Sequence, residues 1–362
     1  MSNAEGPGVK KTTVAVIFGG QSSEHSISCL SAASVLSAVN RETYDVEAIG
    51  IDRRGVWYRV SSDPVDWART PDGGLPTVDV TSAAVHGKID MSELSVDVVF
   101  PVLHGPFGED GTIQGALELL GIAYVGSGVL ASALTMDKQT TKIVLAAAGL
   151  PVGSFVAVTD ADWVLRRDEV LARVAELRFP VFVKPARAGS SIGIAKVGEL
   201  AGVAAAVHDA REHDRKVVIE ESIEGAREIE CGVLANRGHK SPTASICAEI
   251  TISAEHDFYD FDAKYLDDSA TLTVPADLPA VRHAELGELA IRAFSALGAD
   301  GLSRVDFFVD RNGEVVINEV NTMPGFTNIS MFPRMWQESG MSYPHLIDHL
   351  LAVAIDRGSG LR

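Results

Sequence analysis

The sequence predicts an α/β segment with a mainly parallel sheet, followed by segments of the α+β class. Two observations predict this order: strands and helices alternate over the first third of the chain, and a β-hairpin with a tight-turn dipeptide lies near the C-terminus. The 362 residues are 46% hydrophobic and 22% charged, as in ordinary globular proteins, and their number fits two or three domains. Disordered, fibrous and coiled-coil proteins are therefore poor interpretations.

The N-terminal segment follows a strand–helix–strand–helix order. The predicted elements are a β-branched strand over residues 13–18, a helix over 31–39, a buried strand over 96–103 and a helix over 111–120. Gly19 and Gly20 turn the chain after the first strand, and Gly121 ends the second helix. This pattern predicts a parallel sheet. Residues 52–88 are polar and predicted to be irregular, and we assign them no function.

The rest of the chain mixes helices with strands that do not alternate regularly. The predicted elements are a helix over residues 136–148, a strand over 181–184, a helix over 199–211, strands over 216–223, 230–235 and 243–250, a helix over 282–297, a hairpin over 302–321 and a helix over 343–356. The loop at 253–270 is long for a compact domain and rich in Asp and aromatic residues. It therefore predicts a lid that orders when substrate binds.

Net charge, cysteine content and hydropathy argue against several classes of partner and site. Lys and Arg number 31 against 49 Asp and Glu, a net charge of -18, which argues against nucleic acid and anionic membranes as partners. Cys29, Cys231 and Cys247 are an odd number far apart in the sequence, which suits neither a disulfide framework nor a Cys-x-x-Cys metal site. No apolar run approaches the ~20 residues of a membrane span, so we expect a cytoplasmic protein.

The hairpin over residues 302–321 carries the strongest chemical signal. Asn312-Gly313 is a preferred pair for a two-residue turn in which both residues have positive φ. Counting outward from this turn, the predicted cross-strand pairs are Arg311–Glu314, Asp306–Glu319 and Arg304–Asn321. Because side chains alternate along a strand, Arg304, Asp306, Glu319 and Asn321 are expected on one face.

Two carboxylates on that face would lie about 4.5–5.5 Å apart and repel each other unless a cation lies between them. Asp306, Glu319 and the amide oxygen of Asn321 are hard ligands, and Mg²⁺ commonly combines one or two carboxylates with phosphate oxygens and water. The alternative is a solvated polar face on which Arg304 neutralises the acids. From the residues alone, both interpretations stay open.

Two further features are typical of phosphate binding. Lys184 ends an apolar strand and precedes a loop that contains Gly189, Ser190, Ser191 and Gly193, whose N–H and O–H groups could approach an anion. Taken alone, such a loop is more often a plain turn. The chain contains neither G-x-x-x-x-G-K-S/T nor G-x-G-x-x-G after its first strand, which argues against a P-loop enzyme and an ordinary dinucleotide-binding dehydrogenase.

Lys138 lies in the first turn of a helix that Thr135 could cap. A cation there opposes the helix dipole, and Lys142 four residues later adds repulsion, so a functional reason is expected. The alternative is that Asp137 compensates and Lys138 extends into water. Together with the Gly/Ser loop and the acidic hairpin, the lysines predict a magnesium-bound nucleoside triphosphate between domains.

The sequence resembles the D-alanine:D-alanine ligases of the ATP-grasp superfamily. The resemblance spans residues 13–352 and rests on motifs in the family's order: GGQSSEHSIS, HGPFGEDGTIQG, MDKQTTK, VKPARAGSSIGI, DFYDFDAKYL, GLSRVDFFVD and INEVNTMPGFTNIS. It implies an ATP-grasp fold with three domains. These are a Rossmann-like preATP-grasp domain over residues 12–133, a small central domain over 134–227, and a larger C-terminal domain over 228–362 that carries the metal site and a mobile loop over 253–270.

The resemblance also implies an activity. The family joins two D-alanines through an acyl phosphate, converts ATP to ADP and phosphate, and supplies D-alanyl-D-alanine for peptidoglycan. It implies two Mg²⁺ ions, which Mn²⁺ can replace, K⁺ as a candidate activator, a cytoplasmic location and a homodimer.

Carried over motif by motif, the resemblance implies a role for each matching residue. The implied phosphate ligands are Lys138, Lys184, Ser190 and Ser191. The implied contacts to adenine and ribose are Glu220, the backbone of Ser222 and Ile223, and Glu228. The implied metal ligands are Asp306, Glu319 and Asn321, and the implied oxyanion donors are Arg304 and the backbone of Gly325. The implied substrate contacts are Glu24 and His104 for the first ammonium, and Ser330 and Met331 with Lys264 for the second carboxylate. Tyr265 and Ser190 would link the mobile loop to Glu24.

Each residue also has an ordinary structural explanation. Glu24 suits a helix start, His104 could satisfy backbone groups, Tyr265 could simply pack, Ser330 could cap a helix, and Glu228 could be a surface carboxylate. Three other functions remain as alternatives: ligation with D-lactate as second substrate, against which Tyr265 argues; a non-catalytic nucleotide-binding protein; and a dehydrogenase built on the first strand–helix–strand unit.

Overall fold

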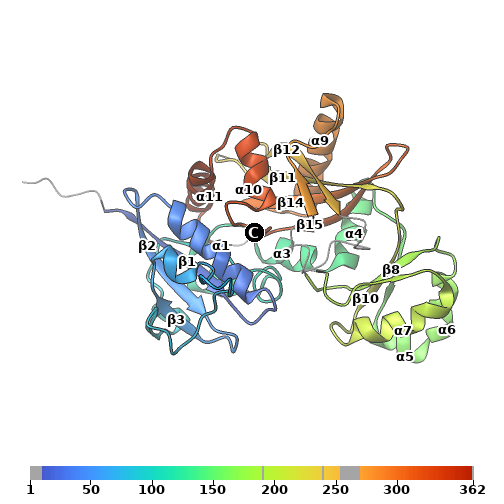
Figure 1. Ribbon diagram of the computed structural model, residues 1–362, viewed down its shortest axis with the longest axis horizontal. Helices are drawn as coiled ribbons and strands as arrows, with labels where there is room; N and C mark the ends of the chain where they lie inside the picture. The colour runs from blue at the N-terminus through green and yellow to red at the C-terminus, as the bar shows by residue number, and fades with distance from the viewer. Residues whose placement is uncertain (1–9, 190, 239, 253–269, 361–362) are drawn as a thin grey trace, which may run out of the picture.

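The computed structural model describes residues 10–189, 191–238, 240–252 and 270–360, and builds them around three sheets (Figure 1). The first sheet has six strands in the order β4-β3-β2-β1-β5-β6. Its strands are β1 Thr12–Gly19, β2 Tyr44–Ile51, β3 Trp57–Val60, β4 Val85–Lys88, β5 Val98–Pro101 and β6 Ala123–Tyr124. Strands β2, β1, β5 and β6 are parallel, with helices α1 His25–Ala38 and α2 Thr112–Leu120, so the predicted parallel sheet is confirmed.

The expectation of irregular structure over residues 52–88 was wrong in part. This segment contains β3, the 3₁₀ helix η1 Pro64–Trp67 and β4, and the two strands extend the sheet in antiparallel fashion, with β4 at its edge. The reason is apolar burial. Trp67 is 1% exposed, and its ring packs edge-on against Phe18 with 4.8 Å between centroids.

The second sheet has four antiparallel strands in the order β7-β10-β8-β9. They are β7 Phe155–Val158, β8 Val181–Pro185, β9 Ala195–Val197 and β10 Val217–Glu221, with helices α5 Asp160–Leu165, α6 Arg167–Val174 and α7 Leu200–Arg211. Its core is built mostly from β-branched valines and includes Trp163.

The third sheet has five antiparallel strands in the order β13-β12-β11-β14-β15. They are β11 Arg227–Leu234, β12 Thr243–Ile252, β13 Ala270–Thr273, β14 Leu302–Val309 and β15 Val315–Asn321, accompanied by α9 Ala280–Ala296, α10 Met331–Glu338 and α11 Tyr343–Arg357. Although distant in sequence, Cys231 and Cys247 face each other across β11 and β12, both buried and both free.

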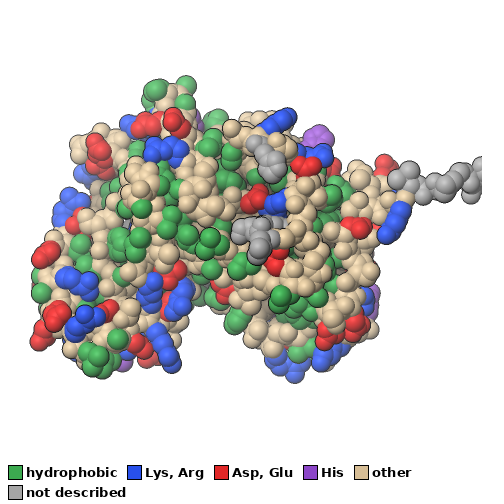
Figure 2. All heavy atoms as spheres, turned by 180° about the vertical axis from the view of Figure 1, so that it is seen from behind, with side chains coloured by type: hydrophobic (Ala, Val, Ile, Leu, Met, Phe, Trp, Pro, Cys, Tyr) green, Lys and Arg blue, Asp and Glu red, His purple; other side chains and the backbone are tan. Residues whose placement is uncertain are grey.

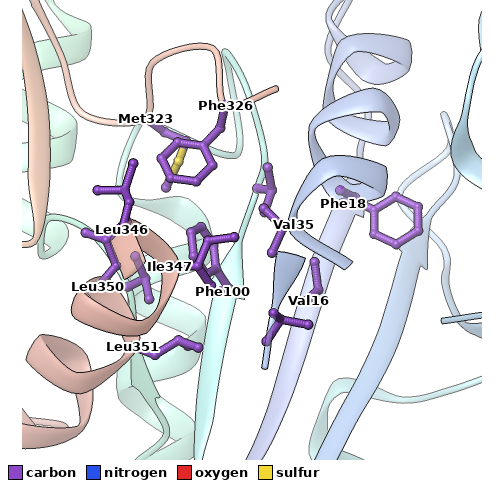
Figure 3. Packing of buried hydrophobic residues seen from close by; sticks show 14 of the residues in the cluster. Val16, Phe18, Val35, Phe100, Met323, Phe326, Leu346, Ile347, Leu350 and Leu351 are labelled. Carbon is purple, nitrogen blue, oxygen red and sulfur yellow. The ribbon is translucent and has the colours of Figure 1, made fainter. Parts of the chain in front are cut away.

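Helix α11 joins the C-terminal part of the chain to the first sheet. Leu346, Ile347, Leu350 and Leu351 are fully buried, and Figure 3 shows them in the same cluster as Phe100 and other residues of the N-terminal segment. This shared core fixes the first sheet relative to the loop that follows β15.

The predicted helix over residues 136–148 is confirmed as α4 Lys138–Ala147, and a further helix that was not predicted, α3 Val129–Met136, precedes it. The prediction that Thr135 caps α4 was wrong, because its hydroxyl donates instead to the carbonyl of Ala131. Asp137 caps α4: its carboxylate accepts from the N–H of Thr140 at 3.0 Å, and it also pairs with Lys216 at 2.8 Å. Asp is a stronger N-cap than Thr, and its charge offsets that of Lys138.

The turn of the β14–β15 hairpin differs from the prediction, but the pairs beyond it are confirmed. Asp310, not Arg311, faces Glu314, because the turn has three central residues, of which Gly313 has φ +84°. The Asp310 carboxylate stabilises it by accepting from the N–H groups of Asn312 and Glu314. A bulge then adds one residue at Asn318, and this restores the predicted register of Asp306 with Glu319 and Arg304 with Asn321.

On the face shown in Figure 2, Lys and Arg side chains are mixed with Asp and Glu and form no continuous basic surface. Among the described residues, no helix combines the length and apolar character that a bilayer span requires.

Candidate active site

A cavity of about 1000 Å³ opens where the three sheets meet. Its walls come from α1 and the loop after β5 on one side, β8 and β10 on another, and β11, β14, β15 and the start of α10 on the third. Lys138, Lys184, Asp306 and Glu319 all line it. The topology therefore brings together the predicted lysines and the acidic hairpin, which lie far apart in the sequence.

The hairpin presents its polar side chains on one face, as predicted, since Arg304, Asp306, Glu319 and Asn321 all line the cavity. Arg304 binds Asp306 with two hydrogen bonds of 2.7 Å, and Asn321 donates to Asp306 at 3.0 Å. The ion pair between Arg304 and Asp306 is the contact that the alternative interpretation expected. It coexists with an open cavity in front of the carboxylates.

Arg304 is held by a second acid that the sequence prediction missed. Glu230 on β11 lies opposite Asp306 and approaches Nε of Arg304 to 3.1 Å. Burial disfavours the charged form of Arg304, but the negative charges of Asp306 and then of Glu230 outweigh this effect. They raise the pKa of Arg304 well above its ordinary value. The guanidinium is therefore a fixed cation. Strand alternation from Glu228 could have placed Glu230 on this face.

The donor set of the hairpin fits magnesium bound together with phosphate. Within the described ranges, no three His, Cys, Asp or Glu side chains come together in a way that could hold a metal by themselves. Asp306, Glu319 and Asn321 offer two carboxylates and an amide oxygen at one cavity wall. This is the small, oxygen-only set that Mg²⁺ uses when phosphate oxygens and water complete its shell.

Lys138 and Lys184 reach the cavity from two different walls. Nζ of Lys138 donates to the carbonyl of Ala188 in the Gly/Ser loop at 2.8 Å, and it lies 4.0 Å from Glu319. Lys138 thus connects the loop to the hairpin rather than extending into water. A bidentate pair between Arg187 and Asp214, at 3.0 and 2.6 Å, holds the base of the same loop.

Glu220 lies between two lysines. Its Oε2 is 2.9 Å from Nζ of Lys184 and 3.5 Å from Nζ of Lys142, while Oε1 is buried and has no hydrogen-bond partner among the described residues. Burial opposes ionisation, but Lys142 and then Lys184 outweigh it and lower the pKa of Glu220. The sequence suggested only repulsion from Lys142, because the partner strand was not visible in the local pattern.

The other predicted nucleoside contacts line the same end of the cavity. They are Ser222, Ile223 and Glu228, the last half-buried rather than on the open surface. Phe182 and Phe308, which the sequence prediction missed, add aromatic surface there. Phe182 lies opposite Glu220, and Phe308 lies opposite Glu228, so each aromatic shares a face with a predicted polar contact.

Glu24 lies at the opposite end of the cavity, at the start of α1. It is 7% exposed, and its carboxylate packs so closely against two glycines that a Cβ on Gly105 or Gly189 would come within 2.5 or 2.8 Å of Oε2. Gly189 belongs to the Gly/Ser loop. The glycines therefore allow the loop from the second sheet to close over an acid from the first.

His104 holds this end of the cavity together. One ring nitrogen lies 3.0 Å from the hydroxyl of Ser31, and the other lies 3.1 Å from the carbonyl of Met323. Burial lowers the pKa of His104, so a neutral ring that donates to Met323 and accepts from Ser31 satisfies both contacts. Both nitrogens are thus committed to protein groups.

Glu109 is a half-buried acid that the sequence prediction left without a role, although it lies in the HGPFGEDG motif. It accepts from the N–H of Gly105 at 2.7 Å and of Met323 at 3.1 Å, which ties the loop after β5 to the loop after β15. Burial, and then the charge of Glu24, raise the pKa of Glu109 from 4.5 to about 8.

This shift predicts a pH-dependent stability. Between pH 4.5 and about 8, native Glu109 keeps a proton that the unfolded chain releases, so the free energy of unfolding falls as pH rises. The slope from this residue is at most about 1.4 kcal/mol per pH unit. Urea unfolding from pH 5 to 8 should show that Glu109→Gln loses this component. Parallel pH curves for the two proteins would contradict the assignment.

The loop after β15 and the start of α10 form the last wall. Ser330 occupies the N-cap position of α10, but its hydroxyl bonds to Thr327, at 2.7 Å to Oγ1 and 3.1 Å to N, rather than to the helix. The first N–H groups of α10, beginning at Met331, therefore receive no side-chain cap, which suits an anion. Gly325 packs against Ser330, where a Cβ would lie 3.2 Å from Oγ.

Three predicted residues, Ser190, Lys264 and Tyr265, lie outside the described residues, as does the predicted lid apart from Ala270, with which β13 begins. All other predicted site residues line the one cavity: Glu24, His104, Lys138, Lys184, Ser191, Glu220, Ser222, Ile223, Glu228, Arg304, Asp306, Glu319, Asn321, Gly325, Ser330 and Met331.

Comparison with solved structures shows that the protein is a ligase with the ATP-grasp fold. The D-Ala:D-Ser ligase VanG from Enterococcus faecalis superposes with a TM-score of 0.81 and 37% identity, over 95% of this chain and 100% of that one. The D-alanine–D-alanine ligase from Coxiella burnetii gives 0.79 and 35%, over 96% and 95%.

Sequence comparison defines the family. Residues 13–127 match the family described as D-ala D-ala ligase N-terminus, and residues 144–352 match D-ala D-ala ligase C-terminus. A D-alanine–D-alanine ligase of Arthrobacter sp. (strain FB24) is 53% identical over 98% of this chain and 97% of its own length, and one of Kineococcus radiotolerans is 51% identical over 97% and 99%. The chain belongs to the D-alanine–D-alanine ligase family.

Proposed function

We propose that the protein joins two molecules of D-alanine into D-alanyl-D-alanine, with conversion of ATP to ADP and phosphate, for peptidoglycan synthesis. The observation that carries this proposal is the meeting of the acidic hairpin with Lys138 and Lys184 in one cavity, in a chain 53% identical to a D-alanine–D-alanine ligase.

ATP lies along the wall formed by the second and third sheets. Its phosphates face Lys138, Lys184 and the hairpin, and its adenine lies between Phe182 and Phe308. Glu220 supports this placement, because it lines the cavity and its Oε1 has no hydrogen-bond partner among the described residues, so a rotation of the carboxylate would let it accept from an exocyclic amine. Glu228 receives the ribose, and the N–H groups of the Gly/Ser loop, including Ser191, cover the phosphates.

The two D-alanines lie at the other end. Glu24 holds the ammonium of the first, and the uncapped N-terminus of α10, at Ser330 and Met331, holds the carboxylate of the second. The first carboxylate attacks the γ-phosphorus to give ADP and an acyl phosphate. The amine of the second D-alanine then attacks the acyl carbon, and the tetrahedral intermediate expels phosphate.

The fixed guanidinium of Arg304 and the N–H of Gly325 stabilise the oxyanion that develops in the second step. Arg304 is suited to this because its acids hold it in place before the substrate arrives. Asp306, Glu319 and Asn321 would hold magnesium, which would supply positive charge to the phosphate oxygens when bound. Charge fixed in advance lowers the barrier more than charge that must reorganise during reaction.

Several finer assignments belong to the same proposal. We include two Mg²⁺ ions, which Mn²⁺ can replace, K⁺ as a candidate activator, a homodimer and a cytoplasmic location. The domains are residues 12–133, 134–227 and 228–362. The packing supports a close link between the second and third domains, since Leu145 and Leu150 of the second belong to the core of the third sheet.

A coupled assay of ADP release tests the proposal. Release should saturate with D-alanine and remain at background with L-alanine, as expected of a relative of the D-alanine–D-alanine ligases. Product analysis with D-alanine, D-lactate and D-serine in competition should give the D-alanine dipeptide. Binding of ATP without D-alanine-dependent release would support a non-catalytic nucleotide-binding protein instead.

A further inference from the structure

Lys142, in the second turn of α4, is a buried charge without a role in the ligation described above. It is 2% exposed, although lysine is almost never fully buried unless it is paired. Its Nζ lies 3.5 Å from Oε2 of Glu220 and 3.5 Å from the carbonyl of Asn318. Its side chain does not line the cavity, so we expect no direct contact with a bound nucleotide.

Lys184 shares the same carboxylate oxygen but is placed differently. Its Nζ is 2.9 Å from Oε2 of Glu220, and both Lys184 and Glu220 line the cavity. A ligand in the cavity can therefore draw Lys184 away from Glu220, whereas Lys142 lies behind the wall and keeps its position. The two lysines are unequal partners of one acid.

We propose that Lys142 is a positioning residue: it remains the counter-ion of Glu220 when Lys184 turns to the nucleotide phosphates. This inference rests on the proposed binding of ATP in the cavity. Without Lys142, the move of Lys184 would leave Glu220 as a buried, uncompensated carboxylate beside the nucleotide, and breaking a buried ion pair in this way is strongly unfavourable. ATP binding would then have to supply that cost.

The same ammonium also connects the nucleotide wall to the metal wall. Asn318 is the extra residue of the β15 bulge, and this bulge sets Glu319 opposite Asp306. The Nζ of Lys142 lies 3.5 Å from the carbonyl of Asn318, a contact too long to hold the bulge by itself. The other charged groups near it are Lys184 and Glu319, which partly offset each other.

A double-mutant cycle tests the inference. Binding of Mg-ATP without D-alanine is measured by calorimetry for the wild type, Lys142→Met, Glu220→Gln and the double variant. Lys142→Met should weaken binding about 10- to 100-fold when Glu220 is present, and less than about twofold when Glu220 is replaced by Gln. A merely structural lysine would cost the same factor in both backgrounds, and this outcome would overturn the proposal.

Two controls keep the result interpretable. Ile143→Ala changes the next residue, whose side chain is 51% exposed, and should leave Mg-ATP affinity unchanged. If Lys142→Met does not fold, the comparison of Glu220→Gln with the double variant still decides, because a further loss of affinity there contradicts the proposal. A wild-type protein that fails to bind Mg-ATP would instead reject the proposed function.

Discussion

Arg304→Lys is expected to lower kcat for D-alanine-dependent ADP release about 10²- to 10³-fold and to change the KM for ATP by less than about threefold. Lysine keeps one positive charge but cannot reproduce the two parallel hydrogen bonds to Asp306 or the contact to Glu230. The cation therefore moves away from the position that the oxyanion will occupy. The loss should appear in the chemical step rather than in nucleotide binding.

Steady-state kinetics with saturating D-alanine separate the two parameters. Arg311→Lys is the matched control, because Arg311 lies on the same hairpin at its exposed tip and should retain full activity. Circular dichroism checks that both variants fold. If Arg304→Lys raised the KM for ATP and left kcat intact, Arg304 would be a nucleotide contact and not an oxyanion donor.

Glu319→Gln is expected to lower kcat/KM for Mg-ATP about 100-fold or more. The substitution keeps the shape of the side chain but removes one of the two carboxylates that the hairpin offers to magnesium. It also removes the acid that lies 4.0 Å from Lys138. Weaker metal binding predicts that raising the Mg²⁺ concentration recovers part of the activity.

Glu314→Gln provides the comparison for this variant, since Glu314 lies on the same hairpin but is exposed at the turn. Its Mg²⁺ dependence should match that of the wild type. Equal Mg²⁺ dependence of the wild type and Glu319→Gln would exclude Glu319 as a metal ligand.

Much of the fold was predictable because it depends on local patterns. The strand–helix alternation of the N-terminal segment predicted the parallel sheet, and Gly121 marked a helix end correctly. Strands β3 and β4 were missed because polar residues surround the few buried anchors of this segment, such as Trp67 in η1. Packing against Phe18, which local sequence does not reveal, orders that segment.

The hairpin illustrates how a correct pairing can follow from an incorrect turn. The dipeptide Asn312-Gly313 predicted a two-residue turn, whereas the Asp310 carboxylate stabilises a longer one. The bulge at Asn318 compensates by one residue. A bulge depends on its neighbours in space, here Lys142 and the segment at Pro151, so the local sequence could not show it.

The residues that the sequence prediction missed are those whose roles depend on other strands. Glu230 contacts Arg304, Lys142 contacts Glu220, and Glu109 accepts from the backbone N–H of Met323. Each lies in the same stretch of sequence as a residue that was assigned a role: Glu228, Lys138 and His104, respectively. Their functional context appears only when β10, β11 and the loop after β15 meet, because a single strand shows which face a side chain occupies but not what it faces.

Binding of Mn²⁺, followed by electron paramagnetic resonance, tests the magnesium role of the hairpin most directly. With ADP present, the wild type should bind Mn²⁺ at least about tenfold more tightly than without nucleotide, and Glu319→Gln should lose most of this gain. Mn²⁺ affinity that is the same with and without ADP, or unaffected by Glu319→Gln, would contradict a metal ion shared between these carboxylates and the nucleotide phosphates.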